Sequence, residues 1–91
     1  MTKGEYRVGI NFNPGNNDVV WQIKSAAAAL IDLINALPTE THTIHDSHIE
    51  VHMSSQAMEV GRLKALAMTA IEEGAMWAVK AATKPALEEN K

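Results

Sequence analysis

The sequence predicts an all-α fold: an antiparallel helical hairpin with an extended N-terminal arm, assembled into a compact symmetric homo-oligomer. Residues 18–37 and 55–83 have apolar positions at helical spacing, and each segment is followed by a proline. Residues 1–17 lack this spacing. The second helical segment carries more apolar surface than one hairpin of 91 residues can bury.

Composition narrows the class of protein before any motif is considered. The chain is 46% apolar but only 4% aromatic, so we expect a core of aliphatic side chains and methionine. The absence of cysteine excludes disulfides, cysteine metal sites and thiol catalysis. No apolar run reaches the roughly 20 residues of a membrane span, and a net charge of −3 argues against DNA binding. We therefore expect one cytosolic domain, residues 1–91, with no membrane or DNA partner.

The arm and the first helix are separated by a clear turn signal. Residues 1–17 are expected to be an extended arm that ends in a tight loop at residues 13–17 (NPGNN). Asn16 or Asn17 suits the N-cap of a helix at residues 18–37, and Pro38 ends it. One face of this helix carries the apolar residues Val20, Ile23, Ala27, Leu30, Ile34 and Leu37.

Residues 38–54 form a His-rich connection whose structure the sequence leaves open. Its β-branched residues allow a short β-hairpin, and an irregular loop is the alternative. On a helix, His45, His48 and His52 would share a face and could ligate zinc. Because the β-branched residues disfavour a helix here, we favour a solvated loop that includes His42, and we expect no metal site.

The second helix is predicted at residues 55–83, with residues 84–91 as a tail. Ser54 or Ser55 suits its N-cap, and Pro85 stops it. Because this helix is apolar nearly all round, it should be buried nearly all round, and copies of the same chain would supply the missing cover. The alternative is a monomer in which the arm and the connection cover these faces.

Motifs for catalysis are scarce. The sequence has no P-loop, dinucleotide glycine fingerprint, nucleophile elbow or HExxH helix. Glu72 and Glu73 are adjacent, so on a helix they point to different sides and do not form an acid–base pair. We expect a protein that is not an enzyme and has no cofactor.

The arm and the first helix carry residues that suit a small nucleotide. Phe12 could stack on a base, and Lys24 and Arg7 could supply positive charge. Asn11 and Asn13 offer amides beside a helix N-terminus, where phosphate is favoured. The structural alternatives are a hydrophobic plug for Phe12 and a solvated surface position for Lys24.

A second basic spot lies near the start of the second helix. Arg62 follows Gly61, and in a symmetric assembly one arginine per subunit could converge on a cyclic phosphate ligand. The structural alternative is an ordinary pair between Glu59 and Arg62, three residues apart on a helix.

Several stretches of the sequence resemble a known family. The most specific is residues 76–80 (MWAVK), followed by residues 11–14 (NFNP). These stretches are similar to the phage-encoded cyclic-nucleotide sponges, the anti-CBASS protein and its Thoeris anti-defence relatives, which share a helical hairpin domain. Residues 39–57 and the tail lie outside the resemblance, which also covers residues 7–10, 23–24, 30–32, 62, 65–67, 69, 72–73, 81 and 83.

The resemblance implies a homohexamer that sequesters cyclic oligonucleotide immune second messengers without cleaving them, in the cytoplasm of the infected bacterial host. It implies that cyclic dinucleotides lie between paired subunits, with Phe12 stacked on a base and Lys24 at the phosphates. Family members often have tyrosine at this aromatic position, so Phe12 keeps the stacking and loses a hydroxyl hydrogen bond. Cyclic trinucleotides would bind where three subunits meet, at Arg62 with Gly61 and Ala65 beside it.

Three alternatives stay open at this point. Cyclic ADP-ribose derivatives are an alternative ligand within the same family. A ligand-free helical adaptor, or an inhibitor of a host defence protein, is the alternative function from another class. A zinc-binding module built on the histidines is the third.

Overall fold

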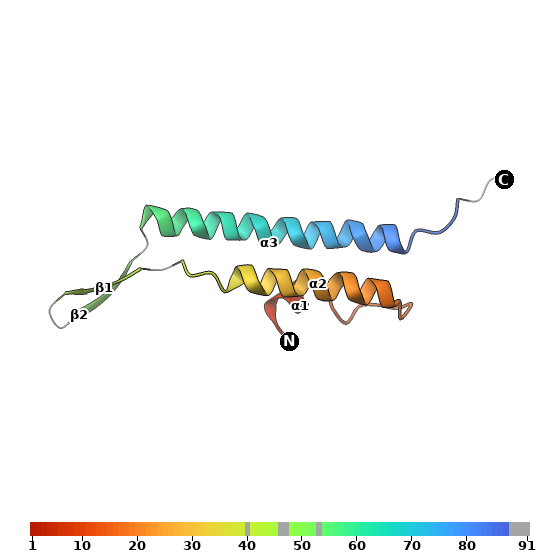
Figure 1. Ribbon diagram of the computed structural model, residues 1–91, viewed down its shortest axis with the longest axis horizontal. Helices are drawn as coiled ribbons and strands as arrows, with labels where there is room; N and C mark the ends of the chain where they lie inside the picture. Colours follow the sequence, from red (N-terminus) through yellow and green to blue (C-terminus); the bar gives the residue numbers. More distant parts are fainter. Residues whose placement is uncertain (40, 46–47, 53, 88–91) are drawn as a thin grey trace.

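Two long antiparallel helices lie side by side and form the body of the molecule (Figure 1). The computed structural model describes residues 1–39, 41–45, 48–52 and 54–87. No helix in these ranges is both long and apolar enough to cross a membrane. The elements in chain order are α1 (Lys3–Val8), α2 (Asp18–Asn35), β1 (Thr41–His45), β2 (His48–His52) and α3 (Ser55–Ala82). The pairing of α2 with α3 confirms the predicted helical hairpin.

The N-terminal segment is not an extended arm, because residues Lys3–Val8 form the helix α1. Thr2 and Glu5 make a capping box: the Glu5 N–H donates to Thr2 Oγ1 at 3.1 Å, and the Thr2 N–H donates to Glu5 Oε1 at 2.8 Å. Gly9 ends the helix in the left-handed conformation, with φ of 66°. The prediction was wrong because six residues are too few to display an apolar period.

Helix α1 packs against α2 through a glycine. Gly4 is buried, and an added Cβ there would lie 2.1 Å from the backbone oxygen of Ala28. The Gly4 N–H donates to Asp32 Oδ1 at 2.7 Å, so the side chain of α2 also satisfies a free N–H at the start of α1. The two backbones therefore meet at a distance that only glycine allows.

The buried face of α2 differs from the predicted one. Its buried residues are Val20, Lys24, Ala28 and Ile31, whereas Leu30 of the predicted face is 45% exposed. The buried face is rotated relative to the predicted one, because Lys24 points inward and Ala28 packs against Gly4 of α1. Helix α2 also ends two residues before the predicted Leu37, where Lys64 of α3 donates to the carbonyls of Asn35 and Leu37.

The N-caps of both long helices are among the predicted residues, because the side chains of Asn17 and Ser54 accept from the N–H groups of Val20 and Ala57. In the connection, β1 and β2 pair antiparallel with Ile44 opposite Ile49, so the backbone takes the β-hairpin alternative. The side chains of these strands, including all four histidines, lie outside the described residues.

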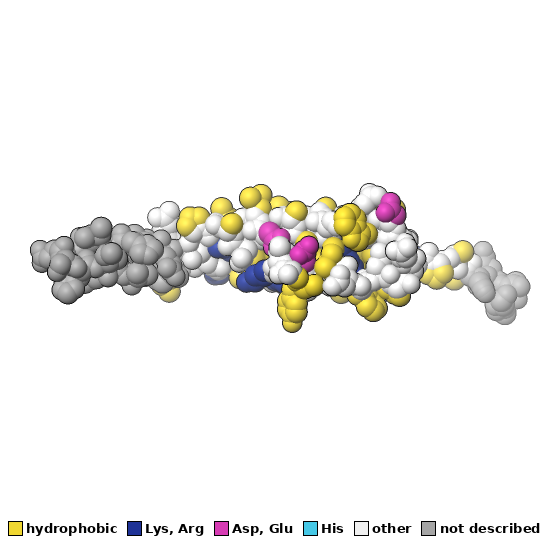
Figure 2. Space-filling model, turned by 90° about the horizontal axis from the view of Figure 1, so that it is seen from below, with side chains coloured by type: hydrophobic (Ala, Val, Ile, Leu, Met, Phe, Trp, Pro, Cys, Tyr) yellow, Lys and Arg dark blue, Asp and Glu magenta, His cyan; other side chains and the backbone are white. Residues whose placement is uncertain are grey.

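Helix α3 buries little of its apolar surface within one chain. It ends at Ala82, one residue before the prediction, and its buried residues are Ala57, Met68 and Ala75. Figure 2 views the hairpin from below, the side on which α1 and α2 lie in Figure 1, and apolar side chains are spread over that face as well, among basic and acidic ones. The symmetric assembly therefore stays an expectation, supported by the exposed large apolar residues Met58, Leu63, Leu66, Met76 and Trp77.

Candidate functional site

Lys24 is the centre of the candidate site. It is only 8% exposed, and its ammonium donates to the backbone carbonyls of Gly9 at 2.9 Å and Phe12 at 2.5 Å. The solvated-lysine alternative is therefore wrong. The same nitrogen lies 5.5 Å from the centroid of the Phe12 ring, within cation–π range. Because Phe12 is 73% exposed, the hydrophobic-plug alternative is also wrong.

The loop that carries Phe12 is closed by amide side chains. Asn13 donates from Nδ2 to the carbonyl of Asn17 at 2.8 Å and accepts the Asn17 N–H on Oδ1 at 3.0 Å. Asn16 has a φ of 48°, the left-handed conformation that asparagine tolerates better than most residues. Asn13 therefore shapes the loop, while Asn11 is exposed and its place beside a ligand stays a prediction.

Three of the predicted site residues line one hollow, which we call the loop groove. It has a volume of about 380 Å³ and is lined by Phe12, Asn13 and Lys24, with Val79 of α3 and the C-cap residue Thr83 opposite. An aromatic face, an amide and an ammonium thus surround a space between the N-terminal loop and the end of α3. Val79 and Thr83 were not predicted, because an aliphatic residue and a threonine carry no recognisable binding signal.

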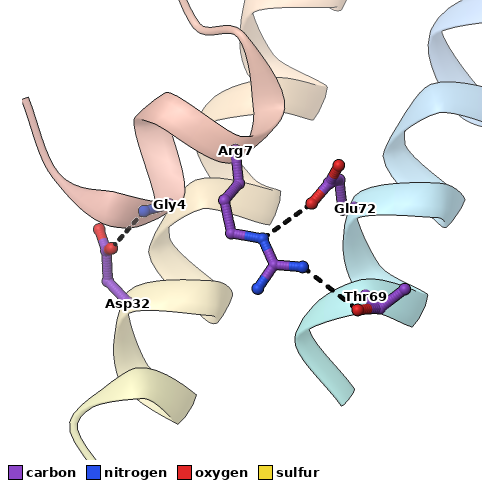
Figure 3. A network of polar contacts seen from close by, with 5 residues as sticks. All are labelled: Gly4, Arg7, Asp32, Thr69 and Glu72. Carbon is purple, nitrogen blue, oxygen red and sulfur yellow. Dashed lines mark hydrogen bonds and ion pairs between the residues drawn. The ribbon is translucent and has the colours of Figure 1, made fainter. Parts of the chain in front are cut away.

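Arg7 does not line the loop groove; its side chain joins α1 to α3 (Figure 3). Its Nε donates to Glu72 Oε1 at 2.8 Å, and a second guanidinium nitrogen donates to Thr69 Oγ1 at 3.3 Å. Arg7 lines a second hollow of about 470 Å³, the Arg7 groove, together with Glu72, Glu73 and Lys24. Lys24 thus lies on the boundary of both grooves, while the charge of Arg7 is matched by a carboxylate.

The predicted trinucleotide residues lie toward the opposite end of α3 from Val79 and Thr83. Arg62 makes two hydrogen bonds to Glu59: Nε donates to Oε1 at 2.9 Å, and Nη2 donates to Oε2 at 2.6 Å. The pair lowers the pKa of Glu59 and raises the pKa of Arg62 from their ordinary values. Within one chain, Arg62 therefore makes the ordinary ion pair with Glu59 that was the structural alternative. Its neighbours are half-buried Gly61 and exposed Ala65.

Comparison with known protein families decides the identity of the fold. A family model described as Acb2/Tad1, hairpin domain, matches residues 5–83. The chain belongs to the Acb2/Tad1 hairpin-domain family. No curated protein and no solved structure matches the sequence.

The family assignment confirms the resemblance and gives the site a context. Acb2/Tad1 is an anti-CBASS and anti-Thoeris sponge family, which supports a phage anti-defence role in binding cyclic nucleotides at the level of the family. The match contains all residues of the loop groove as well as Arg62. In this Acb2/Tad1 hairpin domain the match begins within α1, at Glu5, and includes the loop after it.

The metal alternative concerns a different part of this Acb2/Tad1 chain. In the part of the chain that the structure describes, no three or more His, Cys, Asp or Glu residues are placed to hold a metal ion. The side chains of His42, His45, His48 and His52 lie outside it, so the expectation of no metal site and the zinc alternative are both untested.

Proposed function

We propose that this Acb2/Tad1 hairpin domain binds and sequesters cyclic oligonucleotide immune second messengers without cleaving them. In this role it blocks CBASS-type signalling in the cytoplasm of the infected bacterial host. The observation that carries the proposal is the ammonium of Lys24, held beside the exposed ring of Phe12 in the loop groove of a family member.

The chemistry of the loop groove suits a cyclic dinucleotide. Such a ligand presents base faces and phosphodiester anions close together. Phe12 offers an exposed aromatic face for a base, and base–aromatic stacking contributes about 1–3 kcal/mol. Lys24 offers a charged donor that two carbonyls already orient, and hydrogen bonds between charged groups are the stronger ones.

Binding without cleavage agrees with how the polar groups of the two grooves are used. Lys24 donates to two carbonyls, which suits a fixed cation and not a proton acceptor. Glu72, a carboxylate of the Arg7 groove, accepts from Arg7. These contacts engage the Lys24 ammonium and one oxygen of Glu72 within the chain, which supports a binding role for both groups.

We also propose that the working form is a homohexamer whose subunits complete the grooves. Both grooves are open to solvent in one chain, and α3 leaves large apolar side chains exposed, among them Met76 of the Arg7 groove. A neighbouring copy would cover this surface and enclose the ligand. Cyclic trinucleotides would bind at Arg62 where three copies meet, and cyclic ADP-ribose derivatives are the alternative ligand.

Recovery of the bound nucleotide tests the proposal. The protein is incubated with a cyclic dinucleotide, freed of unbound ligand, digested with proteinase and analysed by chromatography. We expect the intact cyclic dinucleotide after digestion, and none from a Lys24→Met variant. Recovery of a linear product would indicate an enzyme, whereas no retained nucleotide from a panel including cyclic trinucleotides would favour the adaptor alternative.

A further inference from the structure

The position of the Lys24 side chain depends on Gly9 and Phe12, which precede it in the chain by 15 and 12 positions. An ammonium has three N–H donors, and Lys24 gives two of them to the carbonyls of Gly9 and Phe12. Gly9 is the C-cap of α1, and its N–H is held by the carbonyls of Glu5 and Tyr6. A shift of α1 would therefore carry the Gly9 carbonyl away from Lys24.

The place of α1 is set by the contact of Gly4 with α2. A Cβ on Gly4 would lie 2.1 Å from the Ala28 oxygen, 2.8 Å from the Ala28 carbonyl carbon and 2.8 Å from Asp32 Oδ1. Two of these atoms are backbone atoms of a helix, which cannot rotate away as the end of a side chain could. Any side chain at position 4 must therefore displace α1 from α2.

We propose that Gly4 is a positioning residue for nucleotide binding: it holds α1 against α2 so that the Gly9 carbonyl fixes the ammonium of Lys24. For the ligand this inference rests on the proposed function, whereas the fixing of Lys24 does not. Gly4 itself lies outside both groups of groove residues given above, so it acts through Lys24 and the loop.

The expected consequence is a loss of preorganisation. With α1 displaced, Lys24 loses a carbonyl partner, and the loop that carries Phe12 has to be ordered when the ligand binds. Ordering a loop on binding lowers affinity although every ligand-contacting side chain is still present. Helices α2 and α3 also contact each other directly, and those contacts are not part of this change.

The first arm of the test uses the protein without any nucleotide. Acylation of lysine amines by an N-hydroxysuccinimide ester is followed by mass spectrometry in wild type, Gly4→Ala and Gly74→Ala. Gly74 is the matched glycine, because an added Cβ there meets open space. We expect Lys24 to react more slowly than exposed Lys80 in wild type and Gly74→Ala, and roughly tenfold faster in Gly4→Ala once its partner is lost.

A second pair of variants guards against a simple folding defect. Gly9 has a φ of 66° and open space around it, so Gly9→Asn keeps a conformation that asparagine tolerates, whereas Gly9→Val does not. We expect valine to expose Lys24 and asparagine to leave it protected. Protection of Lys24 in folded Gly4→Ala and Gly9→Val alike would overturn the inference.

The second arm measures binding by calorimetric titration with a cyclic dinucleotide. We expect Gly4→Ala to bind about tenfold more weakly than wild type, with its helical circular dichroism retained. If wild type did not bind the cyclic dinucleotide, the proposed function would be refuted, whereas the acylation result on the fixing of Lys24 would still hold. Equal affinity of wild type and Gly4→Ala, with Lys24 exposed in the variant, would overturn the positioning role alone.

Discussion

The loop groove and the start of α3 each contain a positive side chain that was predicted to meet a phosphate, but the two are held in different ways. Lys24 is buried and donates to carbonyls 12 and 15 positions away in the chain. Arg62 is exposed and pairs with Glu59, three positions away on the same helix. The fold therefore preorganises the first cation, whereas the second is held only by a neighbour on its own helix.

The same contrast appears between the two arginine–glutamate pairs. Arg7 and Glu72 are 65 positions apart, and the pair joins α1 to α3 with the Arg7 side chain 21% exposed. The Arg62–Glu59 pair joins nothing beyond one turn of α3. A long-range pair organises tertiary structure, whereas an exposed pair one turn apart contributes little to stability.

The largest expected effect is on Lys24. Lys24→Met keeps an aliphatic side chain but leaves the Gly9 and Phe12 carbonyls without their donor and removes the charge for phosphate. We expect roughly 100-fold weaker binding of a cyclic dinucleotide, the size typical of a lost charged hydrogen bond. Calorimetry checks this, with Lys80→Met as the control on an exposed lysine. If Lys24→Met bound the cyclic dinucleotide as tightly as wild type, the buried ammonium of Lys24 would not be a phosphate-binding group, and its contrast with Arg62 would lose its functional meaning.

Phe12→Ala should have the next largest effect. The ring is exposed and lies beside Lys24, so its removal costs stacking without opening a cavity. We expect about tenfold weaker binding of cyclic dinucleotides, from stacking of about 1–3 kcal/mol, and restored affinity in Phe12→Tyr. Affinity for cyclic trinucleotides, measured in the same titration series, should not change. A parallel loss of both ligands would place Phe12 outside a dedicated dinucleotide site.

The two arginines can be compared directly by chemical denaturation at one protein concentration. Arg7→Met breaks the long-range pair, and we expect the free energy of unfolding to fall by about 1 kcal/mol, a modest value because Glu72 is 44% exposed. Arg62→Met should leave stability unchanged. If the two variants were equally stable, the distinction between the tertiary and the local pair would be lost.

The smallest effect is expected at Glu59. A glutamate is charged at neutral pH, and the Arg62 guanidinium lowers the pKa of Glu59 further, so the carboxylate competes with any phosphate for Arg62. The pair is present above the unfolded pKa of a glutamate and is lost only as the pH falls through the lowered folded value. Glu59→Gln should therefore strengthen cyclic trinucleotide binding roughly twofold at pH 7. Weaker binding in this variant would argue that the carboxylate positions Arg62 for the ligand.

Local signals in the sequence predicted the long helices well. The side chains of Asn17 and Ser54 cap them as expected, and Pro38 and Pro85 lie shortly after their ends. Helix α1 was missed, although the spacing of Thr2 and Glu5 is a capping-box signal. A short helix shows no apolar period, so its cap was the only local evidence for it.

What the sequence did not predict depends on contacts between distant segments. Lys24 was expected in solvent or at a ligand, and nothing local indicates that carbonyls of residues 9 and 12 would receive it. Arg7 was expected beside the nucleotide, but Glu72 holds it at α3. Asn13 was expected at a ligand, and it also closes the loop. The roles of Lys24 and Arg7 depend on the position of α1, which packs on α2 at Gly4, whereas the contact of Asn13 with Asn17 is local.

The proposed function requires a cyclic dinucleotide held at a Lys24 that α1 has already fixed, in a site that copies of the chain complete. Native mass spectrometry with and without a cyclic dinucleotide reports both the number of subunits and the bound ligand. We predict an assembly of several copies whose mass increases by whole, uncleaved ligands, and no such increase for Lys24→Met. A monomer that stays unliganded at micromolar concentration, or a Lys24→Met variant that takes up as much ligand as wild type, would contradict it.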